Sequence, residues 1–206
     1  MATQTRSPAT GATVHDMPSW QLARRDRIVQ AAMTALEQQE FEHIQIRDVA
    51  QAAGVALGTV YRYFSSKEHL YAAVLQAWAE PGRRPVRRAA QLTAEQRVRA
   101  RMRGVVAAFE RQPQFFKVQV LLQGSVDENA RQLMTEFVAS AQQWLVADLE
   151  PLGKEAEDAA TMLWAVLNTM LTVAIYHGRS MREVYRIADK FIDLLVPALD
   201  AAAIED

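Results

Sequence analysis

The sequence predicts an all-α protein with a small N-terminal helical domain and a larger C-terminal helical domain. Apolar residues recur three and four positions apart over most of the chain, and no stretch shows the alternation of a strand. The clearest interruption of this pattern, rich in Pro and Gly, falls at residues 81–85. We therefore expect three regions: a disordered tail at 1–20, one domain at 21–80 and a second at 81–206.

Composition places the chain among globular proteins. Half of its 206 residues are apolar, which is enough for a core without covalent cross-links. The absence of cysteine excludes disulfides and thiolate metal sites, and it fits a reducing compartment. The sequence contains neither a run of 18 apolar residues nor the apolar segment of a signal peptide. We therefore expect a cytoplasmic protein without a membrane partner.

The first domain should begin with a helix over residues 22–40. Before this helix, residues 1–20 are rich in Ala, Thr, Ser and Pro and lack periodicity, which is typical of a disordered tail. Within the helix, Ile28, Ala32 and Leu36 form one apolar stripe. This stripe should face the core of the N-terminal domain.

Two short helices around a glycine turn should follow. Val49 and Ala53 lie four residues apart on one apolar face of the first short helix. Gly54 comes where this helix ends, a position that favours glycine because glycine adopts positive φ freely. Val60 and Phe64, also four apart, form the inner face of the second short helix.

The outer face of the second short helix carries residues that a folded protein does not need at its surface. Two tyrosines and an arginine should point outward together within the set Leu57, Gly58, Thr59, Tyr61, Arg62 and Tyr63. Such exposure adds little to stability, whereas side chains of these types bind phosphates and base edges. The segment therefore indicates a helix-turn-helix DNA reader.

This segment resembles the DNA-binding domain of the TetR family of bacterial repressors. The similarity rests on the run Gly-Thr-Val-Tyr-Arg-Tyr-Phe at 58–64 followed by Lys67, and it extends over residues 24–70. The resemblance implies a palindromic double-stranded DNA operator bound by a homodimer. It also implies DNA contacts by Gln45, Arg47, Leu57, Gly58, Thr59, Tyr61, Arg62, Tyr63 and Lys67.

The implied contacts differ in kind. Tyr63 and Lys67 should bind phosphates, Arg62 could read a guanine, and Gly58 would allow close approach of the backbone. Gln45 stands where the family more often has threonine, so its role is less well defined by the resemblance.

The helix expected over 67–79 should connect the two domains. Glu68 lies three residues after Ser65, as in a capping box. Leu70 and Tyr71 begin two adjoining apolar faces of this helix, so it should be buried on two sides. Such a helix suits a lever between a sensing domain and a DNA-binding domain.

The C-terminal domain should contain five further helices. Their expected ranges, separated by Pro and Gly, are 94–112, 114–123, 127–149, 155–177 and 180–199. The first three are rich in aromatic, methionine and other large apolar residues, which form adaptable walls. We therefore expect a pocket for a large apolar effector. Its expected lining is Met102, Val106, Phe109, Phe116, Leu121, Leu122, Met134, Phe137, Val138 and Trp144.

The segment 159–175 contains no charged residue. A helix that is apolar on every face is either central in a domain or divided between a core and a subunit interface. A domain of this size has little room for a wholly central helix. We therefore expect a homodimer in which this helix pairs with a second subunit, together with the helix that carries Ile187, Phe191 and Leu194.

Charge is spread unevenly along the chain. Residues 21–80 carry six Lys or Arg against seven Asp or Glu, whereas 81–103 carries eight arginines against one acid. These arginines are Arg83, Arg84, Arg87, Arg88, Arg97, Arg99, Arg101 and Arg103. They allow three interpretations: a solvated linker and helix surface, added phosphate contacts on DNA, or binding of an anionic effector group by planar guanidinium.

A closer resemblance bears on the effector. Segments 45–47, 55–59 and 110–113 look like those of actinobacterial repressors of steroid catabolism of the KstR type. Members of that subgroup respond to coenzyme A thioesters of steroid intermediates. The resemblance implies a steroid-CoA or acyl-CoA effector for this chain.

Patterns of catalytic and metal-binding residues are missing from the sequence. The four histidines are scattered, and neither a nucleophile elbow nor a phosphate-binding glycine loop occurs. We therefore expect no enzyme activity, catalytic residue, cofactor or metal. The alternative to a repressor is a dimeric helical carrier of lipids or other hydrophobic ligands. That alternative explains the apolar domain but not the exposed tyrosines.

Overall fold

The computed structural model describes residues 17–83 and 91–205, with side chains described for 17–80 and 91–201. Every regular element in these ranges is an α-helix or a 3₁₀ helix, which confirms the predicted all-α class. Residues 1–16 of the expected tail lie outside the described residues. The remainder of the expected tail includes the start of the first helix, at Ser19.

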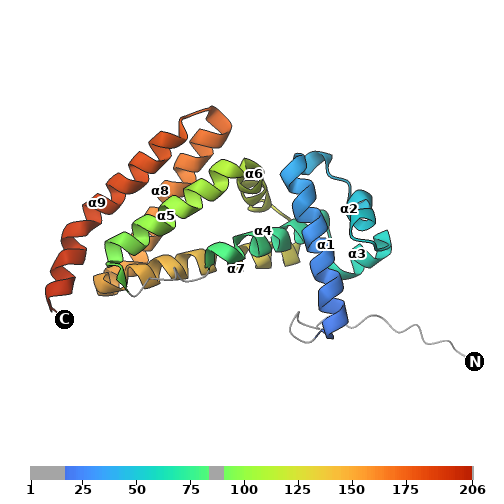
Figure 1. Cartoon of the computed structure of the whole chain (residues 1–206), viewed down its shortest axis with the longest axis horizontal. Helices are drawn as coiled ribbons and strands as arrows, with labels where there is room; N and C mark the ends of the chain where they lie inside the picture. The colour runs from blue at the N-terminus through green and yellow to red at the C-terminus, as the bar shows by residue number, and fades with distance from the viewer. Residues whose placement is uncertain (1–16, 84–90, 206) are drawn as a thin grey trace, which may run out of the picture.

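The elements follow one another in the order α1 (Ser19–Gln38), η2 (Phe41–His43), α2 (Ile46–Ala52), α3 (Leu57–Tyr63), α4 (Lys67–Arg83), α5 (Ala94–Arg111), α6 (Pro113–Leu122), α7 (Glu128–Asp148), η4 (Glu150–Glu155), α8 (Ala156–His177) and α9 (Met181–Glu205). Figure 1 shows α1, α2 and α3 grouped at one end of the molecule and the long helices α5, α7, α8 and α9 at the other. All expected helices occur, and α9 continues past its expected end at residue 199.

The N-terminal helices enclose a small core with the first half of α4. Ile28, Ala32 and Leu36 of α1 are fully buried, as their spacing predicted. On α4, the ring of Tyr71 meets Phe41 edge-on, and its hydroxyl donates a 3.2 Å hydrogen bond to the carbonyl of Ala32. Burial raises the pKa of Tyr71 well above its usual value. Helix α4 is thus held against α1 by both apolar and polar contacts.

The turn between α2 and α3 has the predicted geometry. Gly54 has a φ of 66°, in the left-handed region that favours glycine. Val49 and Ala53 are buried beneath α2, and Val60 and Phe64 are buried beneath α3. The sequence pattern therefore identified the inner faces of both helices correctly.

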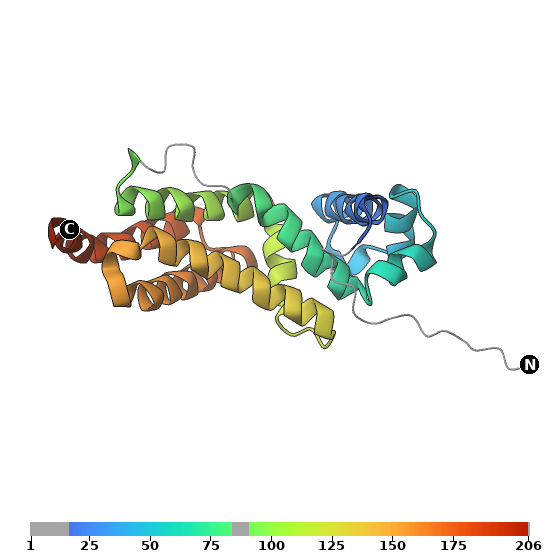
Figure 2. The same cartoon turned by 90° about the horizontal axis from the view of Figure 1, so that it is seen from below.

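Helix α4 belongs to both domains. Its residues 70–75 are all buried, and it packs on α1 and then on α6 and α7. Figure 2 shows α4 running from the N-terminal helices to a position along α7. The helix was expected to stop near Pro81, but it continues to Arg83. Proline near a helix end removes few backbone hydrogen bonds, which explains why the last turn persists.

The start of α4 also differs from the expectation. The predicted capping box between Ser65 and Glu68 is wrong, because the hydroxyl of Ser66 caps the helix instead. This hydroxyl accepts a 3.0 Å hydrogen bond from the backbone N–H of His69. Ser65 is therefore available for contacts with the C-terminal domain.

The C-terminal domain is a bundle of long helices. Helix α5 packs against α9, and α8 packs against both α7 and α9. The shorter α6 contacts α4, α5, α7 and α8. One connected cluster of buried side chains runs from Ile28 in α1 to Leu199 in α9. The two groups of helices therefore share one continuous core.

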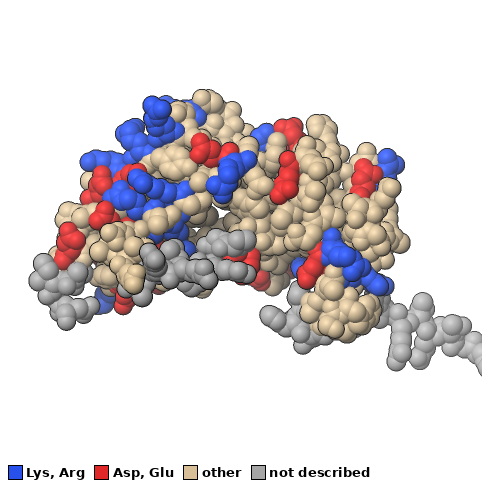
Figure 3. All heavy atoms as spheres, viewed as in Figure 1, with Lys and Arg blue, Asp and Glu red and all other residues tan. Residues whose placement is uncertain are grey.

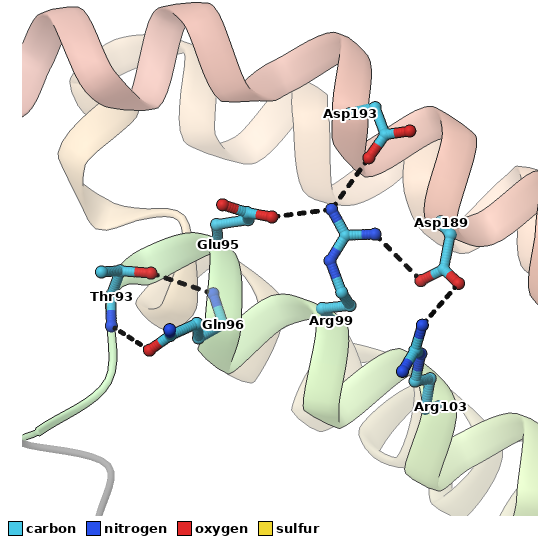
Figure 4. A network of polar contacts seen from close by, with 7 residues as sticks. All are labelled: Thr93, Glu95, Gln96, Arg99, Arg103, Asp189 and Asp193. Atoms are coloured by element: carbon cyan, nitrogen blue, oxygen red, sulfur yellow. Dashed lines mark hydrogen bonds and ion pairs between the residues drawn. The ribbon is translucent and has the colours of Figure 1, made fainter.

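Two arginines of the arginine-rich segment join α5 to α9. Figure 4 shows Arg99 between Glu95, Asp189 and Asp193, at donor–acceptor distances of 2.8, 3.1 and 2.9 Å. Arg103 donates to the other oxygen of Asp189 at 2.9 Å. These hydrogen bonds raise the pKa of Arg99 and, led by the bond from Arg103, hold the pKa of Asp189 below its usual value.

Two further arginines meet at the end of α7. Arg97 and Arg101 both form ion pairs with Asp148, whose side chain is only 8% exposed. Of the three interpretations for the arginine-rich segment, a solvated surface does not fit Arg97, Arg99 and Arg101, which are mostly buried and are partnered by acids of α5, α7 and α9, whereas Arg103 is paired with Asp189 but remains exposed. The side chains of Arg83, Arg84, Arg87 and Arg88 lie outside the described side chains.

Candidate DNA-binding surface and effector cavity

The outer face of α3 forms an exposed tip on the N-terminal domain. Tyr61 is 51% and Leu57 43% exposed, and Arg62 is exposed beside them. A Cβ at Gly58 would meet no atom within 4 Å, so the backbone is open to a ligand there. Thr59 is half-buried on the same helix. We call this set of five residues the α3 tip.

Tyr63 is placed differently from the expectation. Its ring packs against the core, and the guanidinium of Arg62 lies 5.6 Å from the ring centre. Its hydroxyl is buried and has no hydrogen-bond partner among the described residues. The prediction that Tyr63 points outward is therefore wrong.

Lys67 is also engaged within the folded protein. Its ammonium group donates a hydrogen bond to the carbonyl of Phe41 and lies 4.2 Å from the centre of the Phe41 ring. Burial lowers the pKa of Lys67, against the opposing effect of Glu42 and Glu68. A phosphate bound by Lys67 would have to compete with the Phe41 carbonyl, so this contact stays a prediction.

Gln45 and Arg47 lie at the start of α2, which packs on α3. Both side chains are exposed, and Arg47 has only a 3.4 Å ion pair with its neighbour Asp48. On the face shown in Figure 3, Lys and Arg gather over the C-terminal domain rather than the N-terminal one. Binding of an anion by the N-terminal domain would therefore depend on a few positioned groups.

A cavity of about 450 Å³ lies in the C-terminal domain between α4, α5, α7 and α8. Its wall is mostly apolar and contains three of the four tryptophans of the chain: Trp78, Trp144 and Trp164. The volume is in the range of small-molecule sites. Its longer polar side chains are Arg101, Arg111 and Gln112.

The cavity contains some of the residues expected to line an effector pocket. Those that do line it are Met102, Phe109, Phe137 and Trp144. Those packed into the core instead are Val106, Phe116, Leu122, Met134 and, half-buried, Val138. Leu121 lies at a separate cleft between α6 and the N-terminal domain. Helical periodicity identifies a buried face, but it does not distinguish a side chain facing a cavity from one facing another helix.

Trp78 was expected only as part of the buried face of the connecting helix. In the structure its indole stacks on Phe115 at 4.7 Å between ring centres and lies 5.1 Å from Phe109. Phe109 in turn meets Phe116 edge-on at 5.2 Å. The cavity wall is therefore continuous with the aromatic core beneath α6. Trp164 was likewise missed, because the absence of charge in 159–175 indicated only a buried helix.

Two polar contacts join α1 and its end to the region around α6. The side-chain amide of Gln112 donates a 3.0 Å hydrogen bond to Glu37, and the ammonium group of Lys117 donates to Glu40 at 2.9 Å. Hydrogen bonding to Lys117 lowers the pKa of Glu40. Both contacts join the domains directly, and Gln112 also accepts a hydrogen bond from Trp78 of α4.

A third polar contact joins the α3–α4 junction to the start of α7. The hydroxyl of Ser65 donates to Asp127 at 2.7 Å and accepts from the amide of Asn129 at 3.0 Å. The backbone N–H of Ser65 donates to Nδ1 of His69 at 3.1 Å. We call these four residues the Ser65 joint.

The two titratable groups of the Ser65 joint favour its formation at neutral pH. Burial lowers the pKa of His69; Asp127 opposes this shift and Arg25 adds to it, and the ring remains neutral and able to accept a hydrogen bond at Nδ1. Burial acts to raise the pKa of Asp127, but hydrogen bonds from the Ala130 N–H and from Ser65 bring it below its usual value.

Helix α8 divides its apolar side chains between the core and the surface. Leu163 and Leu171 are buried, whereas Met162 is 51% exposed and, on α9, Leu194 is 68% exposed. The segment Glu150–His177 is long and apolar enough to cross a membrane, with a mean hydropathy of 1.5, and 33% of its most apolar window is buried inside the protein. A helix at the core of a folded protein meets the same criteria.

The residues that the structure describes offer no group of three His, Asp or Glu side chains able to hold a metal ion. The acids that do lie close together, Asp189 and Asp193, are paired with Arg99.

Comparison with known proteins identifies the N-terminal domain. Residues 28–74 match the family profile "Bacterial regulatory proteins, tetR family". The HTH-type transcriptional repressor KstR of Rhodococcus jostii is 40% identical over 92 residues, which are 40% of this chain and 43% of that protein. KstR of Mycobacterium tuberculosis is 47% identical over 55 residues, 27% of this chain and 25% of that protein. The alignments thus span less than half the length of these curated relatives.

Solved structures extend the similarity to the whole fold. A TetR transcriptional regulator from Rhodococcus sp. RHA1 superposes with a TM-score of 0.70 at 22% identity, over 85% of this chain and 96% of the other. The regulator FadR from Bacillus subtilis, solved in complex with stearoyl-CoA, has a TM-score of 0.59 at 18% identity, over 84% and 98% of the two chains. The profile match and the KstR alignments thus identify the N-terminal helices as a TetR-type regulatory domain, and the solved structures show that the rest of the chain shares the fold of these regulators.

Proposed function

We propose that the chain is a ligand-responsive transcriptional repressor that binds a palindromic operator as a homodimer and is released by a large apolar effector. The proposal rests on the path of α4, which runs from the α3 tip to the cavity. The helix begins at Lys67, directly after the α3 tip, and further along it contributes Trp78 and Ala79 to the cavity wall. One helix thus joins a surface suited to DNA with a cavity suited to a small molecule.

The α3 tip is the part that would enter the major groove of the operator. Tyr61 offers a hydroxyl, and Arg62 a guanidinium that suits the two acceptors of guanine. Gln45 and Arg47 are exposed at the start of α2 and would bind the sugar-phosphate backbone. The tip requires no rearrangement for these contacts, unlike Tyr63 and Lys67.

The effector would be a coenzyme A thioester of a fatty acid or a steroid. The three tryptophans and the phenylalanines of the cavity suit an apolar body, and Arg111 in the same wall suits an anionic group, whereas Arg101 is paired with Asp148. The structural neighbour FadR was solved with stearoyl-CoA, which supports this ligand class for the fold. An effector releases DNA only to the extent that it binds the released arrangement more tightly.

The exposed apolar face of α8 and α9 supports a homodimer. Met162 and Leu194 are too exposed to contribute to the core of one chain. A two-fold dimer would place two α3 tips about 34–36 Å apart, or a multiple of this, to match one turn of DNA per half-site. Such a regulator acts in the cytoplasm, where bacterial DNA lies.

The proposed function is tested by selecting bound fragments from the source genome and confirming them by gel shift. We expect an enriched inverted repeat. Tyr61→Ala should weaken binding to it about tenfold or more, the effect of one hydrogen bond to a charged phosphate, without changing dimerisation. Absence of enrichment over random DNA at moderate salt would instead favour the dimeric carrier of hydrophobic ligands.

The effector class is tested by thermal-shift titration with stearoyl-CoA and with free stearate. A CoA preference is expected, since Arg111 of the cavity wall would bind the anionic part of the thioester in this proposal. Equal stabilisation by both compounds would contradict the thioester class and leave the DNA-binding function untouched.

A further inference from the structure

Gln112 lies where the cavity, α5, α6 and the DNA-binding domain meet. It follows the last residue of α5 and precedes the first residue of α6, and it lines the cavity. The indole N–H of Trp78 donates a 2.6 Å hydrogen bond to the side-chain carbonyl of Gln112. The amide of Gln112 donates a 3.0 Å hydrogen bond to the carboxylate of Glu37 in α1.

The chemistry of the three groups fixes the orientation of this amide. An indole can only donate, and a carboxylate can only accept. Gln112 therefore satisfies both partners only with its carbonyl toward Trp78 and its NH₂ toward Glu37. A change at the Trp78 side that turns the amide necessarily weakens the bond to Glu37.

We propose that Trp78, Gln112 and Glu37 form a relay through which a molecule in the cavity acts directly on α1 of the DNA-binding domain. The inference rests on the proposed function in one respect, namely that the cavity accepts a small molecule. Trp78 and Gln112 both line the cavity, whereas Glu37 does not. A molecule that moves the indole, or that itself bonds to the amide, competes with the bond between Gln112 and Glu37.

Such competition predicts the direction in which the affinity of the cavity changes when Glu37 is removed. If binding in the cavity and the bond to Glu37 exclude each other, removing Glu37 strengthens binding in the cavity. Trp78 is held by its stack on Phe115, so the indole shifts together with that ring rather than alone. The relay therefore adds a route to α1 that does not pass along the backbone of α4.

The chain contains a matched control for this relay. Lys117 and Glu40 also join α6 to the end of α1, at 2.9 Å, and Glu40 is exposed like Glu37. Neither residue lines the cavity. Glu40→Ala thus removes a similar contact between the domains without touching the relay.

The test uses the full chain and two readouts, neither of which needs DNA or the natural effector. The first is the indole N–H resonance of Trp78 in a ¹⁵N-labelled protein, assigned by its disappearance in Trp78→Phe. The second is the affinity for 1-anilinonaphthalene-8-sulfonate, an apolar anion that fluoresces when shielded from water. The variants are Glu37→Ala, Glu37→Gln and Glu40→Ala.

In Glu37→Ala the Trp78 resonance should shift, and the dye should bind about two- to fivefold more tightly, which is the lower part of the range for loss of one hydrogen bond. Glu37→Gln retains an acceptor oxygen and should behave like the unmodified protein, as should Glu40→Ala.

An unchanged Trp78 resonance in Glu37→Ala would overturn the relay, as would equal shifts in Glu40→Ala. A shifted resonance combined with failure of the operator selection would reject the proposed function and retain the relay. Selection of an operator combined with an unchanged Trp78 resonance would retain the proposed function and reject the relay.

Discussion

The two domains use their arginines in opposite ways. In the C-terminal domain, Arg97 and Arg101 form ion pairs with Asp148, and Arg99 and Arg103 form ion pairs with Asp189. In the N-terminal domain, Arg62 has no ion-pair partner among the described residues and lies over the ring of Tyr63. The arginine-rich segment thus stabilises a helix bundle, while the N-terminal domain leaves Arg62 exposed at its surface.

The number of arginines in a segment therefore does not locate an anion-binding surface. A guanidinium paired with a buried carboxylate has its charge compensated, and moving it to a phosphate would leave that carboxylate unpaired. An exposed guanidinium without a carboxylate partner has no such cost. The positions of the acids, which come from distant parts of the chain, decide which arginines can bind DNA.

Asp148→Ala should have the strongest effect on the paired arginines. This change removes the buried carboxylate with which both Arg97 and Arg101 form ion pairs. We expect the free energy of unfolding to fall by about 3–5 kcal/mol, as for other broken buried ion pairs. Chemical denaturation followed by circular dichroism measures it.

Asp193→Ala provides the matched control. Its pair with Arg99 is half-exposed, so its loss should lower the free energy of unfolding by at most about 1 kcal/mol. A similarly small effect of Asp148→Ala would show that the arginines are not structural and would return them to consideration as DNA contacts.

The next effect concerns Arg62, the exposed guanidinium of the α3 tip. Arg62→Ala should weaken binding to the selected operator by about 1–3 kcal/mol and relax base preference at one position of each half-site. Gel shifts on operators with single substitutions measure both quantities. A uniform loss on all sequences would make Arg62 a phosphate contact instead.

A smaller expected effect is a change in the salt dependence of DNA affinity, which shows which of the two domains binds phosphates. Arg47→Ala should reduce the slope of the logarithm of affinity against the logarithm of salt concentration by about 0.9 for each phosphate that Arg47 neutralises. Arg103→Ala should leave this slope unchanged, since Arg103 bonds to Asp189. Titrations at four or more salt concentrations measure the slopes. A changed slope in Arg103→Ala would show that the arginines of α5 also bind DNA.

The weakest effect is a pH dependence of the Ser65 joint. The pKa of His69 lies below its unfolded value, chiefly because of burial, so the unfolded chain binds the proton more readily. The stabilising contribution of His69 is therefore fully present above about pH 6.5 and is lost as the pH falls through the lower folded pKa. The lowered pKa of Asp127 acts in the same direction at still lower pH.

This dependence is measured by thermal melting between pH 7.5 and pH 5, relative to His69→Gln. The unmodified protein should lose more stability on acidification than the variant does. Parallel losses in both proteins would show that His69 does not titrate in the joint.

Local pattern was sufficient for most of the N-terminal domain. The spacing of Val49, Ala53, Val60 and Phe64 predicted two inner faces, and Gly54 predicted the turn between them. Such features depend on neighbours within one or two helical turns. The exception is Tyr63, whose orientation depends on packing against the rest of the core and was predicted wrongly.

The cavity was harder to predict because its wall is assembled from four helices distant in sequence. Met102 and Phe109 were expected, but Trp78 and Trp164 were assigned only to buried helix faces. Ion pairs such as Arg101 with Asp148 link residues on two different helices, and sequence spacing contains no information on that pairing. The approximate ranges of the α-helices therefore followed from local pattern, whereas several of their ends and the polar contacts between them did not.

The continuous course of α4 limits how chimaeric regulators can be built from this chain. Since residues 70–75 are buried and the helix contacts both domains, α4 offers no point at which a foreign DNA-binding domain can be joined freely. One residue inserted into the helix would rotate everything beyond it by about 100° and advance it by about 1.5 Å. That rotation would carry Trp78 out of the cavity wall, so exchange of DNA-binding domains must preserve helical phase as well as sequence compatibility.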